Sequence, residues 1–332
     1  MADRDGFLHE GERGAALLTV LLLVAVMAVV TAAALERLTL ATRLAANVSA
    51  ADQARAYADS ASLLVEQRLG DLVAAQPGKV TLEGDWLGRA QPLAVPGGSA
   101  TVTPYDGGNC FNLNSLVAGQ DAEHLTQRPV ALSQFVALMQ YLGVPSAKAS
   151  AISAAAADWI DSDGVPLPGG AEDETYLSRK PAYRAANRTM QDASELRAVA
   201  GMTPALYNLL APWICALPTT DLSPINVNTL LPAQAPLFAM LVPGKLSVEM
   251  ARAMLAARPA NGYDSTVAFW AAPALRGLTP PAEVAQQVRL TTRWFRAETS
   301  VVLGGTEIRQ VALYDAQARP VRQVRRFDGG GA

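Results

Sequence analysis

An uncharged apolar run near the N-terminus dominates the hydropathy pattern. Residues 15–34 contain no charged side chain, and 20 residues in helical conformation are long enough to cross the hydrocarbon core of a bilayer. After Glu36 and Arg37, apolar and alanine positions continue at helical spacing, and no glycine or proline interrupts the chain before Gly70. The pattern predicts one helix of more than 50 residues, which spans a membrane in its first half and is amphipathic in its second. A secretory signal peptide is usually shorter and is followed by a break.

The pattern changes after Gly70. Short β-branched or alternating runs between glycines and prolines predict strands at 79–83, 99–103 and 111–113, with turns at Pro92 and at 96–98. Helical periodicity then predicts helices at 129–142, 145–158, 193–200 and 203–215, followed by a second helical block at 230–288. Closing strands are predicted at 290–297, 300–303, 306–314 and 321–327, with Gly304-Gly305 as a hairpin turn.

This order of elements predicts an α+β fold in which a long N-terminal helix packs on a small antiparallel sheet and a large helical insertion interrupts that sheet. The expected segments are a leader (1–14), the membrane-spanning part of the helix (15–36), the outer part of the helix with the first strands (37–115), an inserted helical unit (116–217), a second helical unit (218–288), the closing strands (289–328) and a disordered tail (329–332).

Composition and charge exclude several classes of function. The chain is 50% hydrophobic and only 17% charged, and its formal net charge is −3. A chain without excess positive charge lacks the field that phosphate backbones require, so nucleic-acid binding is not expected. Two cysteines and two histidines are too few for a four-cysteine zinc site and make a serine-protease triad improbable.

Cys110 and Cys215 are far apart in sequence, at the two ends of the first part of the predicted insertion. Such a pair suits a single disulfide in an oxidising compartment. Two unrelated buried thiols have the same spacing, so the residues alone leave both alternatives open.

The densest acidic cluster is the string DWIDSDG, from Asp158 to Gly164, followed by the string GGAEDETY that ends at Tyr176. Asp161 and Asp163 flank a tight loop, and Glu172 and Asp173 form a second pair. Oxygen ligands on flexible loops suit Ca²⁺, although the spacing is not that of an EF-hand. A solvated acidic loop fits equally well, and the lack of a nearby histidine base argues against a metal hydrolase.

Two segments resemble the hairpins of helix-hairpin-helix modules: 195–203 and 241–247. In DNA-binding versions the hairpin amides meet phosphates at helix N-termini. Basic residues are sparse here, so we interpret both as structural units. The asparagines of the strings FNLN (111–114) and INVNT (225–229) are expected to cap the helices that follow them.

The N-terminus resembles the prepilin signal of type IV pilins and pseudopilins, because a charged leader ending in Gly14 precedes the apolar helix that starts at Ala15. In that family a membrane peptidase cuts after the glycine. Most members carry glutamate at the fifth mature position, where this chain has Thr19. That departure is typical of the minor pseudopilins called general secretion pathway protein K. An uncleaved signal anchor is the alternative interpretation.

The resemblance extends to the acidic string, which is similar to the calcium-binding segment of the K class. It implies Ca²⁺ bound by Asp161, Asp163, Glu172 and Asp173, with support from Asp158 and Tyr176. It also implies a Cys110–Cys215 disulfide, because similar proteins often carry such a pair, and helical pairs of the SAM-like type.

The function that this resemblance implies is structural and not enzymatic. A single-pass protein of the bacterial inner membrane, with most of its chain in the periplasm, would sit at the tip of the pseudopilus of a type II secretion system and help to initiate its assembly. The expected partners are the I and J minor pseudopilins and the prepilin peptidase. A calcium-dependent membrane-anchored periplasmic adaptor and a minor pilin of a DNA-uptake pilus are the alternatives.

Overall fold

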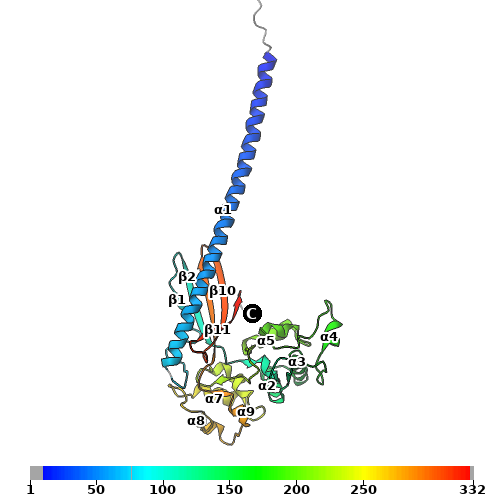
Figure 1. Cartoon of the computed structure of the whole chain (residues 1–332), viewed down its shortest axis with the longest axis vertical. Coiled ribbons are helices and arrows are strands. Elements are labelled where there is room, and N and C mark those ends of the chain that lie inside the picture. The colour runs from blue at the N-terminus through cyan, green and yellow to red at the C-terminus, as the bar shows by residue number, and fades with distance from the viewer. Residues whose placement is uncertain (1–9, 76, 330–332) are drawn as a thin grey trace, which may run out of the picture.

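The structure is a computed structural model that describes residues 10–75 and 77–329. Its first element is a single helix, α1 (Glu10–Ala75), which projects far from the rest of the molecule (Figure 1). The prediction of one long N-terminal helix is therefore confirmed. Most of the predicted leader (residues 1–9) and of the predicted disordered tail (residues 330–332) lies outside the described residues.

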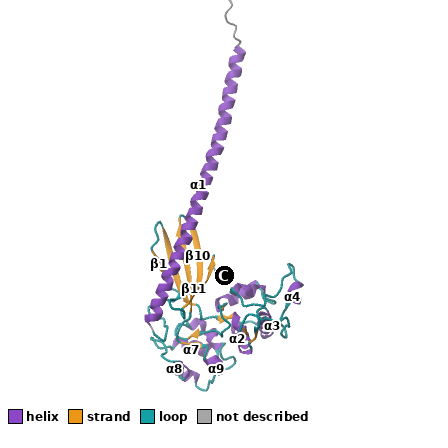
Figure 2. Ribbon diagram, in the orientation of Figure 1, coloured by secondary structure: helices purple, strands orange, loops and turns teal. Residues whose placement is uncertain are grey.

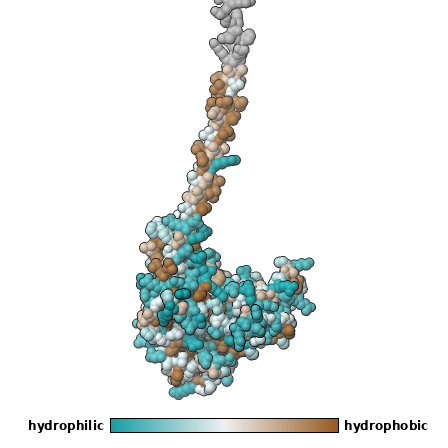
Figure 3. Space-filling model, viewed as in Figure 1, coloured by the Kyte–Doolittle hydropathy of each residue, from teal (hydrophilic) through white to brown (hydrophobic). Residues whose placement is uncertain are grey.

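The two halves of α1 have different surroundings. Residues 14–49 are all exposed, and this half forms the apolar stalk in Figure 3. In the second half the buried positions Ala54, Ala58, Ala61, Val65 and Leu69 recur every three or four residues. That spacing places them on one face of the helix, which packs on the sheet.

The sheet has five antiparallel strands in the order β1-β2-β9-β10-β11 (Figure 2). The strands are β1 (Gln91–Leu93), β2 (Gly98–Asp106), β9 (Trp294–Leu303), β10 (Thr306–Asp315) and β11 (Arg322–Asp328). Strand β2 pairs directly with β9, although the chain between them contains the whole helical insertion. The sheet is thus completed only after the insertion, as the sequence predicts.

Side chains of the sheet that face α1 form its core. Phe295, Ala297, Ala312 and Tyr314 alternate along β9 and β10 and are buried with the helix residues. Alternation places every second side chain on the same face of a strand. The β9–β10 hairpin turns at Gly304 and Gly305, which both have positive φ (56° and 83°), as a tight hairpin requires.

Four local predictions are wrong. The separate strands predicted at 290–297 and 300–303 are one strand, β9, which begins only at Trp294. Residues 79–83 form no strand, and the Val80 N–H instead donates to the Leu290 carbonyl across 2.7 Å. Pro92 lies in β1 and not in a turn, because an edge strand tolerates a residue without an N–H. The predicted helix at 203–215 ends at Leu210, one residue before a short turn containing Pro212, and the chain then enters β6.

The insertion between β2 and β9 consists of short helices and two-residue strands. Its first part contains β3 (Phe111–Asn112), η1 (Leu113–Leu116), β4 (Val117–Ala118), β5 (Thr126–Gln127), α2 (Pro129–Tyr141), α3 (Ser146–Asp158), α4 (Asp173–Leu177), η2 (Ala193–Ala198), α5 (Pro204–Leu210), η3 (Ala211–Trp213) and β6 (Ile214–Cys215). Its second part contains β7 (Ile225–Asn226), η4 (Pro232–Gln234), α6 (Ala235–Ala239), α7 (Val248–Ala256), α8 (Thr266–Trp270), η5 (Pro273–Leu275), α9 (Ala282–Ala285) and β8 (Val288–Arg289).

One cluster of buried apolar side chains runs through both parts of the insertion, from Phe111 to Val288. Within it the buried amides of Gln134 and Gln287 bond each other, at 2.7 and 3.1 Å, so that two polar groups are satisfied inside an apolar core. The helices of the insertion gather at the end of the molecule away from the exposed half of α1 (Figure 1).

A buried polar network joins the insertion to the sheet. Asp106, at the end of β2, accepts hydrogen bonds from the hydroxyls of Thr229 and Thr292, and burial raises its pKa to about 6. The Asn226 side chain donates to the Val80 carbonyl and to the Thr292 hydroxyl. The prediction that asparagines cap helices holds for Asn112, whose side chain caps η1, whereas Asn226 links segments distant in sequence.

Candidate metal centre

The acidic loop lies between two helices of the insertion. Helix α3 ends at Asp158, and α4 begins at Asp173 with Glu172 in the capping position before it. The chain between them is irregular and returns to the end of α3, so the two acidic pairs predicted from the sequence come from the two ends of one loop.

Asp161, Asp163 and Glu172 converge. One carboxylate oxygen from each residue lies within 4.8 Å of the others. Asp161 and Glu172 are buried and Asp163 is exposed, so the cluster has one open side. Three carboxylates on loops at this separation match the ligand type and spacing that a hard cation such as Ca²⁺ accepts.

Two oxygens of the cluster are buried without a hydrogen-bond partner among the described residues: Asp161 Oδ1 and Glu172 Oε1. The other Asp161 oxygen accepts from Gln127 Nε2 at 2.8 Å. Burying a carboxylate oxygen without a partner is costly. A cation between these oxygens would remove that cost, so the residues present fit a metal ion.

The pKa values of the cluster also reflect the burial of carboxylates without a compensating charge. The pKa of Asp161 is raised to about 6, chiefly by burial, with smaller contributions from the charges of Asp163 and Asp158 and an opposing one from the Gln127 hydrogen bond. Burial raises the pKa of Glu172 to about 7, with additional repulsion from the surrounding aspartates, Asp161 foremost. Both pKa values are raised because burial and the neighbouring carboxylates disfavour the charged form.

Asp158, which is expected from the sequence to support the metal site, bonds the backbone of the loop. Its carboxylate accepts from the Ala171 N–H at 2.7 Å and from the Leu167 N–H at 3.1 and 3.2 Å, which closes the loop onto the end of α3. A Cβ on Gly170 would lie 1.9 Å from Asp158 Oδ2, so only glycine fits there. Asp158 therefore shapes the loop that carries the cluster.

Asp173 also lies outside the three-carboxylate cluster. Its two oxygens accept from Arg184 Nη1 at 2.5 Å and from the Ala185 N–H at 3.0 Å. Its place in the first turn of α4 suits an acidic side chain. In this structure Asp173 anchors the chain that follows α4.

Tyr176 is fully buried behind the loop. Its ring stacks on Tyr183 at a centroid distance of 5.3 Å and meets Trp159 edge-on at 5.1 Å, and its hydroxyl accepts from the Ala200 N–H. These contacts hold α4 against the end of α3. Tyr176 therefore supports the position of Glu172 by packing.

Two residues that position the cluster were not foreseen. Gln127 lies in β5, 34 positions before Asp161, and carries no motif that marks it. Gly170 belongs to a Gly-Gly pair whose pattern predicts only a turn. Its steric role follows from its close contact with the Asp158 carboxylate, which the sequence does not indicate.

The two cysteines form a disulfide, with Cα atoms 5.8 Å apart. Cys215 is the last residue of β6, and Cys110 directly precedes β3. The two strands pair in parallel, which brings the two cysteines together. The bond closes a loop of 105 positions and joins the two ends of the first part of the insertion. This confirms the predicted pairing.

The N-terminal residues of interest lie on the exposed half of α1. Gly14 and Ala15 are helical and exposed, and no atom lies within 4 Å of a Cβ built on Gly14. The Thr19 hydroxyl donates to the Ala16 carbonyl at 2.8 Å, so it is satisfied within its own helix. In the described part of the chain α1 is also the one helix that is long and apolar enough to cross a membrane.

Comparison with known proteins identifies two matching family models. Residues 109–219 match the first-domain model of "Type II secretion system (T2SS), protein K", and residues 225–293 match a second model of the same description. Together they cover most of the insertion and end directly before β9.

Curated relatives match over nearly the whole chain. The type II secretion system protein K of Klebsiella pneumoniae is 36% identical over 97% of this chain and 98% of its own length. The corresponding protein of Pectobacterium carotovorum is 34% identical over 96% and 97%. A solved structure, the GspK-GspI-GspJ complex from enterotoxigenic Escherichia coli, contains a chain that superposes with a TM-score of 0.73 and 29% identity, covering 84% of this chain and 97% of that one.

Proposed function

The chain belongs to the protein K family of type II secretion systems, and from this membership we propose that it is a minor pseudopilin that caps the tip of the periplasmic pseudopilus. Members of this family are structural secretion proteins and not enzymes.

The observation that carries this proposal is the division of α1 into two halves. Its exposed apolar half has a mean hydropathy of 2.8 over the most apolar window, and its second half packs on the five-stranded sheet. A helix of this kind anchors the protein in the inner membrane and leaves the sheet and the insertion in the periplasm. A prepilin peptidase removes the leader after Gly14, so that Ala15 becomes the N-terminus.

The partners follow from the solved relative. That structure is a complex of GspK with GspI and GspJ, and we assign the corresponding I and J minor pseudopilins as partners of this chain. The test is co-purification of the full chain, in detergent, with tagged I and J proteins. A one-to-one-to-one complex is expected, and failure of both partners to bind at micromolar concentrations would refute the assignment.

The metal centre is assigned to Ca²⁺. Asp161, Asp163 and Glu172 supply the carboxylates, and two buried oxygens without partners support a bound cation. Ca²⁺ takes six to eight oxygens in flexible geometry, whereas Mg²⁺ demands a tighter octahedral site. Asp173 could become a ligand only if its ion pair with Arg184 were broken. Asp158 and Tyr176 support the site indirectly, because they hold the loop that carries the ligands in place. The ion would hold together the loop between α3 and α4.

The helical pairs belong to the SAM-like, hairpin type in this proposal. Gly201 and Gly244 have positive φ between paired helical elements, and Thr203 and Ser247 cap the helices that follow. The division of the insertion into a calcium-binding unit (116–217) and a second unit (218–288) is part of the same assignment. Both units serve as scaffold, because basic residues around the hairpins are sparse.

A further inference from the structure

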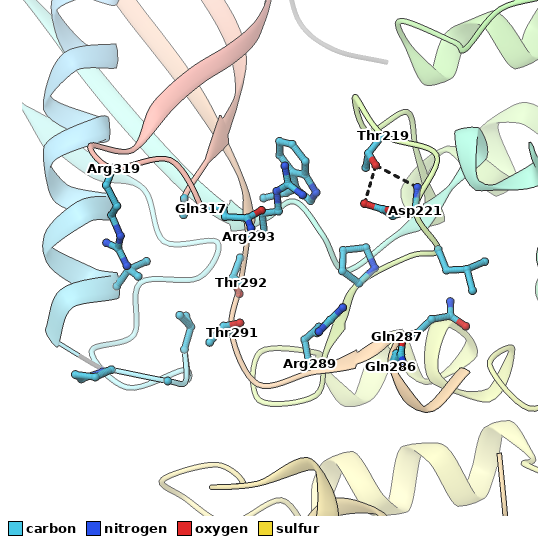
Figure 4. A pocket seen from close by; sticks show the side chains of 18 of the residues that line it. Thr219, Asp221, Gln286, Gln287, Arg289, Thr291, Thr292, Arg293, Gln317 and Arg319 are labelled. Carbon is cyan, nitrogen blue, oxygen red and sulfur yellow. Dashed lines mark hydrogen bonds between the residues drawn. The ribbon is translucent and has the colours of Figure 1, made fainter. Parts of the chain in front are cut away.

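A cleft opens where the end of α1, the base of the sheet and the insertion meet. It has a volume of about 980 Å³ and is lined by residues of all three parts, among them Val73 of α1, Trp294 of β9 and Pro224 of the insertion. Figure 4 looks into this cleft. None of its lining residues belongs to the cluster of Asp161, Asp163 and Glu172. Junctions between structural units are common positions for binding sites.

The cleft is more basic than the chain as a whole. Counting its lining residues gives four positive and two negative side chains, and a third acid just outside the lining pairs with one of the arginines. The sum is 4 − 3, or +1, in a protein whose formal net charge is −3. These residues are Arg128, Arg289, Arg293 and Arg319, with Asp221, Glu283 and the outer Asp315.

Some of these charges already have partners. Arg293 pairs with Asp315 at 3.0 Å, and Arg128 donates to the Thr220 carbonyl. Arg289 and Arg319 are exposed, and their guanidinium groups make no hydrogen bond or ion pair with any residue that the structure describes, although the Arg289 carbonyl accepts from the Val227 N–H. In Figure 4 they stand on either side of the segment that carries Thr291 and Thr292.

The segment between the two arginines has free backbone groups. Thr291 and Thr292 lie between β8 and β9, and their N–H and C=O groups form no hydrogen bonds within the described residues. Thr291 is exposed, whereas Thr292 is buried. The Thr292 side chain is committed to Asp106. Backbone donors and acceptors beside two unpaired cations match a peptide chain with acidic side chains. A compact phosphate would instead require cations that converge on one point.

We propose that this cleft binds an acidic peptide segment of another protein, with carboxylates paired to Arg289 and Arg319 and with its backbone bonded at the exposed Thr291. The pairs form at the mouth of an open cleft, so the interaction is weak and sensitive to salt. The proposal concerns the isolated chain and does not depend on its place in a filament.

Fluorescence anisotropy of the full chain in detergent micelles tests this proposal. The probe is a labelled octapeptide of alternating glutamate and threonine, and the control peptide carries glutamine in place of glutamate. We expect the acidic peptide to bind about tenfold more tightly than the control, and more weakly at about 300 mM than at about 50 mM salt. Equal binding of the two peptides would overturn the proposal.

Matched variants locate the binding site. Arg289→Gln with Arg319→Gln should weaken binding about tenfold, whereas Arg252→Gln with Arg276→Gln removes two exposed arginines outside the cleft and should leave it unchanged. Melting curves establish that both double variants fold. An equal loss of peptide binding in both double variants would show that the effect depends only on net charge, and would refute the assignment of the site to the cleft. Displacement of the peptide by millimolar inorganic phosphate, or tighter binding of a single-stranded oligonucleotide, would identify a general anion site and refute the peptide assignment.

Discussion

At the scale of single residues, the metal centre places two buried carboxylates close together with no cation beside them. Asp161 Oδ1 and Glu172 Oε1 each lack a partner among the described residues. Most buried polar atoms in proteins are hydrogen-bonded, so two orphaned oxygens in one loop indicate a missing positive charge. The behaviour of the protein without metal therefore tests the assignment.

Calcium should stabilise the protein through this loop. At a concentration about 100 times its dissociation constant, a ligand that binds only the folded state contributes about 2.7 kcal/mol. We expect chelation to lower the melting temperature, and Ca²⁺ to restore it better than Mg²⁺.

The double variant Asp161→Asn with Glu172→Gln should show no response to calcium. Glu174→Gln, an exposed neighbour that has no partner among the described residues, should respond like the parent protein. A parent protein whose melting temperature is the same with chelator and with calcium would show that the loop is only solvated.

The same carboxylates predict how pH affects the metal-free protein. The pKa of Asp161 rises from 3.8 to about 6 on folding, and that of Glu172 from 4.5 to about 7. The folded state therefore binds protons more tightly than the unfolded state, and this contribution to stability is lost as pH rises from about 4 to about 7. Metal-free protein should gain stability on going from pH 7.5 to pH 5, relative to the double variant.

With calcium bound, the trend should reverse. Protons compete with the ion for the same oxygens, so the stabilisation by calcium should shrink as the pH falls. Thermal melts followed by circular dichroism, at matched ionic strength, measure both trends. Identical pH profiles for the parent and the double variant would contradict this account of the cluster.

The sequence predicted which acids lie near each other, but not which of them face the same point. Asp161, Asp163 and Glu172 converge, whereas Asp158 and Asp173 are occupied by backbone N–H groups and Arg184. The path of the loop decides this, and it depends on Gly170 beneath Asp158 and on Gln127 in a distant strand. Neither contact is encoded within the acidic string.

At the scale of elements, the long helix and the hairpins were the most predictable features. Helix α1 follows from an uninterrupted periodic pattern, and β9–β10 from alternation around two glycines. The edge strand β1 and the segment 79–83 were misassigned, because three to five residues carry too little periodicity to separate a strand from a loop. There the tertiary contacts decide, as between Val80 and Leu290.

Removal of the leader is a prediction about α1 itself. Helix α1 continues without a break on the C-terminal side of the apolar segment. A signal peptidase that cuts on the periplasmic side would therefore find no extended chain there. Mass spectrometry of the native protein should find Ala15 at the N-terminus. Gly14→Glu should leave the longer precursor, while Gly70→Ala, in the same helix but outside the apolar half, should be processed normally. A native protein that begins at Met1 would indicate an uncleaved anchor.

At the scale of the whole molecule, the insertion is much larger than the sheet that it interrupts. It lies at the end of the molecule away from the exposed half of α1 (Figure 1), and a buried polar network joins it to the sheet there. Subunits of a helical filament follow one another at a fixed rise. A bulk of this size would meet the next subunit above it, whereas the last subunit has no such neighbour.

The position at the tip is therefore a prediction from shape and from one residue. A carboxylate in lipid is costly unless it is paired, and in related pilins the fifth mature residue is a glutamate that pairs with the amine of the neighbouring subunit above. Thr19 carries no charge and bonds within its own helix, so it needs no neighbour. Gold labelling of isolated pseudopili should place this chain at one end of each filament, and Thr19→Glu should bring no gain in secretion.

A tagged major pseudopilin, labelled in the same preparation, provides the control, since it should mark the whole length. Labels of this chain at regular intervals along the shaft would contradict the tip position. That outcome would also require the insertion to fit between stacked subunits, and the geometry of the fold argues against it. The insertion follows β2 and precedes β9, which pair directly with each other, and the hydrogen bond from the Thr229 hydroxyl to Asp106 at the end of β2 ties it to the sheet.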